Sequence, residues 1–429
     1  MPPAFEYHLL DFHVLTNVVL QRYFFLLNLS SMSNHEKRLS DAWTTFFADL
    51  SSAGETIIND PDILSASEKV EGLRHILRKL YLSIGSDLEA SDVEYPELAW
   101  VHPFKSGQDN PDGIYQFAKI DLNYTYKLSG NIGTVRYLGL TIMNLDFSNG
   151  IEQLLTLNAE DLPTNEVGDF ELYLSSEEPP SAADAEKWIT LPAKESNLMI
   201  RQFFSDWNSE EPAKLRLNCH NPSQPAGRLQ ADDLIESLSE ISKKAIDMVW
   251  FWRDFGQAHV KKGEINSFAH IKENQEALLT MGASPEQAYG QCWWTLGKGE
   301  ALIYEVEIPD CVYWGVQLGD QWYQSLDWVN HQSSLNGSQA AIDPDGIFRA
   351  VISAADPGVA NWIDTTGVSE GIITYRWNQS KGAPVPLLTL VKEEEIQHTL
   401  PEFTTFITPD QRRQQLQTRR DGALSRFLR

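Results

Sequence analysis

Residues 302–308 read Leu-Ile-Tyr-Glu-Val-Glu-Ile, so apolar side chains alternate with Ile303, Glu305 and Glu307. Alternation with a period of two is typical of a β-strand buried on one face. Similar short runs, rich in β-branched and aromatic residues, follow at 312–318, 347–353, 371–377 and 387–391. None of the intervening segments fits the helix that connects successive parallel strands. The region from about Cys292 to Lys392 is therefore predicted to form an antiparallel sandwich or jelly roll.

A second β region precedes this one. Short runs at 124–128, 134–143, 170–174 and 215–219 are separated by Gly, Asn, Pro and Asp, which indicates strands and turns. Helical periodicity occurs at 39–50, 73–84, 232–255 and 265–281. Ser65-Ala66-Ser67-Glu68 is a capping-box pattern and predicts the start of the second of these helices.

These patterns predict an α+β fold that is mainly antiparallel β, with two β-sandwich or jelly-roll-like regions, a helical N-terminal layer and a helical insertion between them. The expected boundaries are an extension at 1–31, a helical layer at 32–94, an N-terminal β domain at 95–225, a helical insertion at 226–290, a C-terminal β domain at 291–395 and a basic, helical tail at 396–429. We expect the functional part to begin near Met32, because the apolar segment His8 to Leu29 is interrupted by Asp11 and Arg22 and lacks signal-peptide features.

Charge and composition exclude several classes of partner. The chain has 429 residues and a formal charge of −26, so nucleic acid and anionic membranes would repel it. Its three cysteines, Cys219, Cys292 and Cys311, are too few and too scattered for a disulfide scaffold, which favours a cytoplasmic location. Six arginines after Gln411 predict that the tail docks on the acidic body or on a partner subunit, so a homo-oligomer is one expectation.

Asp109-Asn110-Pro111-Asp112-Gly113-Ile114-Tyr115 and the C-terminal β region resemble the bacterial domain-of-unknown-function 1214 family. The N-terminal half is similar to its partner, domain of unknown function 1254. The likeness covers most of residues 40–395, and its segments are Gly133 to Leu138, Trp188 to Pro192, Arg201 to Trp207, Trp314 to Asn336 and Asp356 to Gly371. The resemblance implies β-sandwich or jelly-roll domains similar to capsid-type double jelly rolls. It implies no established reaction, so no catalytic residue is carried over.

The densest polar cluster is Ser325-Leu326-Asp327-Trp328-Val329-Asn330-His331-Gln332. On a strand, Asp327 and His331 would share a face and could act as a base with its orienting group, or as two metal ligands. Two ligands do not make a metal site, so we predict no metal and no cofactor. In the alternative interpretation this stretch is a turn, with Asp327 and Asn330 capping backbone groups and His331 exposed. Asp343-Pro344-Asp345-Gly346 is likewise typical of a turn and lacks the other ligands of a calcium loop.

The region from Trp293 to Trp377 holds seven of the chain's 13 tryptophans. Aromatic rings beside Asn and Asp can stack on a ligand and hydrogen-bond to its polar groups, as at Asn361, Trp362 and Asp364. The alternative is that these residues cap backbone and plug the end of the sandwich. The candidate catalytic residues are Asp327, His331 and Asp364. The candidate substrate-binding residues are Tyr115, Trp314, Trp322, Trp328, Asn330, Asn361, Trp362 and Arg376.

Nucleotide-binding and hydrolase motifs are missing from the sequence, including GxGxxG, Walker A, GxSxG, HExxH and CxxC. We therefore expect binding or acid/base conversion of a small polar or ring-containing molecule, carbohydrate-like ligands included, in an aromatic-lined pocket. An enzyme would be a nucleotide-independent lyase, isomerase or hydrolase. The alternatives are an assembly protein that uses its β domains for oligomer contacts, and a metal-dependent enzyme.

Overall fold

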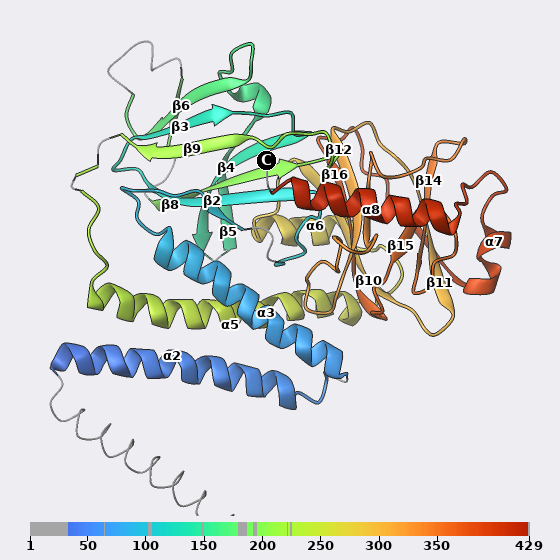
Figure 1. Ribbon diagram of the computed structural model, residues 1–429, viewed down its shortest axis with the longest axis horizontal. Coiled ribbons are helices and arrows are strands. Elements are labelled where there is room, and N and C mark those ends of the chain that lie inside the picture. The colour runs from blue at the N-terminus through green and yellow to red at the C-terminus, as the bar shows by residue number, and fades with distance from the viewer. Residues whose placement is uncertain are drawn as a thin grey trace, which may run out of the picture.

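The computed structural model describes residues 33–63, 65–101, 105–146, 150–178, 187–191, 195–220, 222–223 and 225–427. The predicted extension, 1–31, lies outside the described residues. Two β-sandwiches lie side by side, with long helices running beneath both (Figure 1). The expected α+β fold of β-sandwich type is confirmed.

The N-terminal sandwich consists of two facing sheets whose apolar side chains share one core. In spatial order, the first sheet contains β1 (Ala99–Trp100), β2 (Gly113–Asp121), β8 (Glu195–Phe203), β4 (Tyr137–Asp146) and β5 (Gly150–Asn158). The second contains β7 (Trp188–Thr190), β6 (Asp169–Ser175), β3 (Tyr126–Asn131) and β9 (Lys214–Cys219).

The C-terminal sandwich is built in the same way and encloses a core rich in aromatic rings. Its first sheet contains β10 (Gln287–Thr295), β16 (Glu370–Asn378), β12 (Tyr313–Gly319) and β13 (Ser334–Asn336). Its second contains β15 (Trp362–Asp364), β14 (Ile347–Ser353), β11 (Glu300–Glu307) and β17 (Leu387–Lys392). Strand β10 begins at Gln287, so the C-terminal sandwich starts four residues before 291, the boundary predicted from the sequence.

The two sandwiches have the same topology. Strands β2 to β9 and strands β10 to β17 pair in the same order, down to one short parallel pair in each, β6 with β7 and β14 with β15. The registers also correspond: Tyr115 on β2 lies opposite Arg201 on β8, as Tyr289 on β10 lies opposite Arg376 on β16. The chain thus contains an internal structural repeat. This repeat was not predicted from the sequence.

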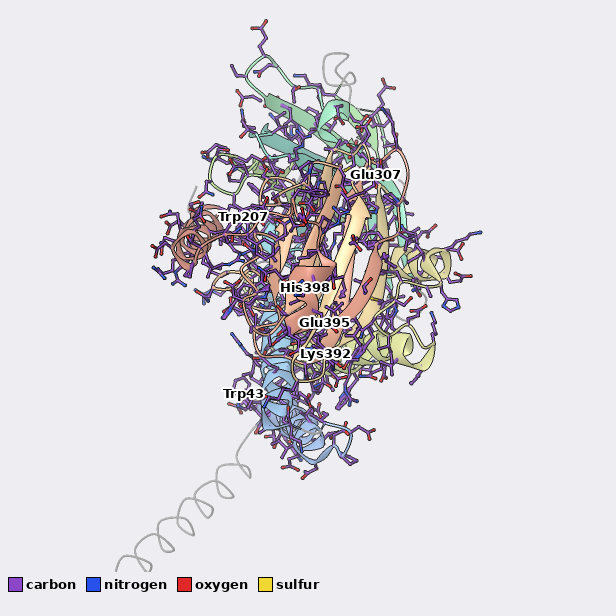
Figure 2. The ribbon with its side chains drawn as sticks, turned by 90° about the vertical axis from the view of Figure 1, so that its right-hand side faces the viewer. Trp43, Trp207, Glu307, Lys392, Glu395 and His398 are labelled. Atoms are coloured by element: carbon purple, nitrogen blue, oxygen red, sulfur yellow. The ribbon has the colours of Figure 1, made fainter. Side chains whose placement is uncertain are left out.

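Three helices form the layer beneath the sandwiches: α2 (Asn34–Asn59), α3 (Ala66–Ile84) and α5 (Ala231–Lys261). Ser33 and Ser65 each cap a helix with a complete capping box. On α2, Phe46 is buried, but Trp43 is 54% and Phe47 50% exposed. The apolar stripe expected at 39–50 is therefore only partly packed, and Figure 2 shows Trp43 on this layer, away from the strands.

The remaining helices are α6 (Ile271–Thr280), shorter than the predicted 265–281, α7 (Ile396–Thr399) and α8 (Pro409–Ser425). One π-helical turn, Gly85–Glu89, and two 3₁₀ turns, Ala159–Asp161 and Glu393–Glu395, complete the helical elements of the described chain. None of the described helices combines the length and apolar character that a membrane crossing requires.

Helix α8 carries the C-terminal arginines back to the body of the same chain (Figure 1). Arg419 donates to the carbonyl oxygens of Trp328 and Ser334, and Arg426 donates to that of Pro111 at 2.8 Å. The guanidinium of Arg426 also lies 4.2 Å from the ring centroid of Trp207, next to α8 in Figure 2. The tail therefore makes its contacts through buried carbonyls and rings as much as through charge.

A carboxylate at the start of each sandwich accepts hydrogen bonds from the other sandwich; Asp112 is buried and Glu286 is half-buried. Asp112, immediately before β2, accepts hydrogen bonds from the hydroxyl of Tyr313 and the amide of Asn336, both at 2.6 Å. The indole N–H of Trp207 donates to it at 2.7 Å. Burial raises the pKa of Asp112, so the ionised form depends on these donors.

The reciprocal contact has Glu286, immediately before β10, as acceptor. Tyr137 Oη donates to it at 2.8 Å, and the amide of Asn158 donates to its other oxygen. Tyr137 begins β4 as Tyr313 begins β12, and Phe203 lies stacked between the two tyrosine rings, at 5.0 and 5.3 Å. The sandwiches are thus joined by the same interaction twice, once in each direction.

The substitution Tyr313→Phe should lower the free energy of unfolding by about 1–3 kcal/mol, because it removes one donor from a buried carboxylate. Tyr304→Phe is the matched control, since the Tyr304 hydroxyl is buried with no partner among the described residues. Urea unfolding followed by fluorescence measures both. Equal losses for the two variants would contradict the role given to Asp112.

Candidate functional site

A cavity of about 180 Å³ lies between the two sandwiches. It is partly open, and its walls come from both first sheets, from α5 and α6 and from the segments that lead into β2 and β10. The lining residues are Val101, Ser106, Gly107, Gln108, Asp109, Tyr115, Met199, Arg201, Phe203, Trp252, Leu278, Met281, Gly282, Ala283, Ser284, Tyr289, Gln291 and Arg376.

Arg201 enters this cavity from β8 of the N-terminal sandwich and is 6% exposed. Its Nη1 donates to Thr141 Oγ1 at 2.9 Å, and its Nη2 donates to the carbonyl oxygen of Gly282 at 2.5 Å. Gly282 belongs to the segment that leads into β10. The guanidinium is therefore fixed by one group of its own sandwich and one from the chain entering the other sandwich.

Arg376 on β16 repeats this arrangement and is also 6% exposed. Its Nη1 donates to Gln317 Oε1, and its Nη2 donates to the carbonyl oxygen of Gln108 at 2.6 Å. Gln317 occupies on β12 the position that Thr141 occupies on β4. Both bonded acceptors are neutral, and Arg376 forms no ion pair with an acid such as Asp364 or Asp327 in the described chain.

The two carbonyl groups that receive the arginines share an unusual backbone conformation. Gln108 has φ +54° and Gly282 has φ +84°, both in the left-handed region. Glycine adopts this region freely, whereas glutamine is strained there by about 1–2 kcal/mol. The carbonyl oxygen of the strained residue Gln108 accepts a hydrogen bond from Arg376. The left-handed conformation therefore occurs in the wall of the cavity.

Tyr115 and Tyr289 line the cavity, each directly across a strand pair from an arginine. Burial raises the pKa of both tyrosines, although Arg201 and Arg376 each lower it for both. The shared effect indicates that the four side chains surround one space. The hydroxyls stay protonated at neutral pH and can serve as hydrogen-bond donors.

Asp109 is the only acidic residue among the described residues that line the cavity. Its oxygens accept bonds from the backbone N–H of Ser325 at 3.1 Å and from its hydroxyl at 2.7 Å. Lys79 is buried and Lys105 half-buried nearby, and the charge of Asp109 raises the pKa of each while burial lowers it. The carboxylate thus acts on the lysines as well as facing the cavity.

The strand expected at 325–331 is wrong: residues 328–330 form a turn. Asp327 accepts hydrogen bonds from the backbone N–H groups of Val329 and Asn330 and from the Asn330 amide. Burial raises the pKa of Asp327, but these bonds from Asn330 outweigh it and lower the pKa overall. Asp327 is therefore occupied in stabilising the turn and does not meet His331 across a strand face.

His331 pairs instead with Asp364, at 2.7 Å between Nδ1 and Oδ2. The His331 side chain is 43% exposed, and neither residue lines the cavity. Asn361 is buried and bonds to the backbone of Ala341 and Arg349, which holds the loop against the sandwich. These positions correspond to the capping alternative in the sequence analysis.

The four candidate tryptophans are buried within the fold and none lines the cavity. Trp314 packs on Phe348 and Trp377 in the sandwich core. Trp322 donates to the carbonyl of Glu68 on α3 at 2.9 Å, and Trp362 donates to that of Ser353 at 3.1 Å. Trp328 packs against Trp207 beneath α8. The ligand pocket expected within the tryptophan-rich sandwich is therefore not formed by these residues.

Of the predicted site residues, only Tyr115 and Arg376 line the cavity. Sequence analysis missed Arg201, Tyr289 and Gln108. A signal was present: Asn110-Pro-Asp-x-x-Tyr115 recurs as Ser284-Pro-Glu-x-x-Tyr289, and Tyr137-x-Gly139 recurs as Tyr313-x-Gly315. Within the described residues, no three His, Cys, Asp or Glu side chains gather in a way that could hold a metal ion.

Lys79, on α3 behind the cavity wall, allows a test of how completely the structure buries the groups in this region. The residue is 1% exposed, and its amine donates to Ser106 Oγ and has a pKa lowered to about 7, mainly by burial. Between pH 7 and 10 the unfolded chain holds a proton here that the folded chain lacks, so folding becomes more favourable as pH rises. Relative to Lys79→Met, the wild type should gain roughly 4 kcal/mol of unfolding free energy across this range. Urea unfolding at several pH values measures the difference, and a flat or falling difference would refute the buried neutral amine.

Comparison with known proteins adds a structural likeness. The chain is similar to the crystal structure of an uncharacterised protein from Burkholderia cenocepacia, with 26% identity, a TM-score of 0.76, and coverage of 84% of this chain and 99% of that one. A protein from Vibrio parahaemolyticus aligns over 74% of this chain and 96% of its own, with 11% identity and a TM-score of 0.45. No protein-family model matches the sequence, and no curated protein matches it.

Proposed function

We propose that this protein binds a small organic anion in the cavity between its two sandwiches. The observation that supports this most strongly is the pair Arg201 and Arg376. Both are buried and both line the cavity, yet neither forms an ion pair with a carboxylate in the described part of the chain. Burying an ionised guanidinium without a counter-charge is costly, so an anion between the two arginines would stabilise the protein.

The size and walls of the cavity favour a compact, ring-containing ligand. A cavity of about 150 Å³ can hold a benzene molecule, and this one measures about 180 Å³. Phe203, Trp252, Leu278 and Met199 provide apolar contacts, while the tyrosine hydroxyls and arginines provide directed polar ones. A carboxylate on a single ring, of the size of benzoate, suits both kinds of wall.

The other functions expected from the sequence remain secondary proposals. Acid/base conversion of the ligand would use Tyr115, Tyr289 or Asp109, the titratable groups that accompany the arginines in the wall. The assembly alternative would use the β domains and the arginine tail for contacts between subunits. Trp314, Trp322 and Trp328 are buried, and α8 docks on its own chain. Cytoplasmic location and membership of the domain-of-unknown-function 1214 family remain predictions from the sequence.

Benzoate should raise the melting temperature of the wild-type protein in a concentration-dependent manner, because a ligand that binds only the folded state stabilises it by mass action. The double variant Arg201→Gln/Arg376→Gln should weaken benzoate binding at least tenfold, since a hydrogen bond to a charged group contributes about 1.5–3 kcal/mol. Arg228→Gln, which removes an exposed arginine, is the control and should bind as the wild type does.

Thermal shift at constant ionic strength gives the screen, and isothermal titration gives the dissociation constants. Each variant is compared with its own ligand-free sample, because loss of an arginine that bridges the sandwiches also changes the melting temperature. A benzoate effect that persists undiminished in the double variant would show that the anion binds elsewhere, and the proposal would fail.

A further inference from the structure

We infer that the ligand carries two acidic groups, one for each of two matching half-sites in the cavity. The inference rests on the proposed function and narrows its ligand class from organic anions to dianions, of which a dicarboxylate is the simplest. The inference is based on the internal repeat of the fold, because the repeat places the same pair of side chains, an arginine and a tyrosine, twice around one cavity.

Each half-site consists of an arginine and the tyrosine opposite it on the neighbouring strand. Arg201 with Tyr115 forms one, and Arg376 with Tyr289 forms the other. Side chains directly opposite one another on an antiparallel pair have Cβ atoms about 4.5–5.5 Å apart, so both can contact one ligand group. An arginine and a protonated tyrosine together suit a carboxylate, which accepts hydrogen bonds only.

Both guanidinium groups retain unused donors. An arginine has five N–H groups in a planar fork. The protein bonds account for Nη1 and Nη2 of each residue, through Thr141 and Gly282 for Arg201 and through Gln317 and Gln108 for Arg376. The remaining N–H groups are available to a ligand, so each arginine can hold its own carboxylate.

The charges of the wall also require two negative groups. Asp109 is the one acidic group among the described lining residues, and its oxygens are already bonded by Ser325. Lys105 lies close enough for the Asp109 charge to act on it, whereas the pKa of the Lys79 amine is lowered to about 7. Asp109 and Lys105 therefore offset each other's charge, which leaves the two guanidinium charges for the ligand to balance, and a monoanion would balance only one.

The half-sites differ in one respect that gives the ligand a direction. The residue that follows the left-handed carbonyl is Asp109 in one repeat and Ala283 in the other. Gln291 on β10 also lines the cavity, whereas Phe117, at the matching position on β2, does not. The end of the ligand near Arg376 therefore lies among more polar groups than the end near Arg201. A hydroxyl or amine substituent would be accommodated at the Arg376 end.

The test compares anions that differ in the number and spacing of carboxylates. Isothermal titration of the full chain is carried out with benzoate, with the three benzenedicarboxylates, and with succinate, glutarate and adipate. At least one dicarboxylate should bind tenfold or more tightly than benzoate. Arg201→Gln and Arg376→Gln should each reduce that dicarboxylate to about the affinity of benzoate, and the double variant should bind neither.

The outcomes separate the two proposals. If benzoate binds as tightly as every dicarboxylate, the inference is overturned while the proposed anion site stands. If no anion of either series binds, both are overturned. If a single arginine variant keeps the full preference for the dicarboxylate, the matching half-sites are wrong. Should a variant not fold, the wild-type comparison of one and two carboxylates still decides the question.

Discussion

The structure depends on two carboxylates, one at the start of each sandwich, that accept hydrogen bonds from a tyrosine and an asparagine of the other sandwich. Asp112 is bound by Tyr313 and Asn336 of the C-terminal sandwich, and Glu286 by Tyr137 and Asn158 of the N-terminal one. Asp112 is buried, so removing its donors would be costly, and Glu286 makes the corresponding contact from a half-buried position. The sandwiches are consequently fixed in one relative position, and the groups between them are preorganised.

The same repeat accounts for the cavity. Arg201 and Arg376 project from equivalent strands into the space between the sandwiches, and each is anchored to the chain entering the other sandwich. The groups that hold the two guanidinium groups in place are all neutral, so these contacts do not neutralise the arginine charges. Because the fold is repeated, the guanidinium group appears twice around the same space. The two halves are not identical, since Asp109 in one corresponds to Ala283 in the other.

Strand alternation, helical periodicity and capping boxes were sufficient to predict the β-sandwich class and the α3 and α5 helices, because each of these signals is local. The candidate site was harder to predict, since Tyr115, Arg201, Tyr289 and Arg376 are brought together only by register across strands far apart in sequence. The high density of tryptophans led to a wrong prediction of where the pocket lies, because large rings such as Trp314 fill a sandwich core as effectively as they line a pocket. Asp327 and His331 were misplaced because a turn, unlike a strand, has no alternating faces.

The central claim is that an anion occupies the junction of the repeat. The most direct measurement is a crystal structure of the protein grown with 4-bromobenzoate, in which the bromine is located by its anomalous scattering. The account predicts one strong peak inside the cavity, with the carboxylate bonded to Arg201 or Arg376 and the ring against Phe203 or Trp252. A fully occupied peak outside the cavity, or an empty cavity at saturating ligand, would contradict it.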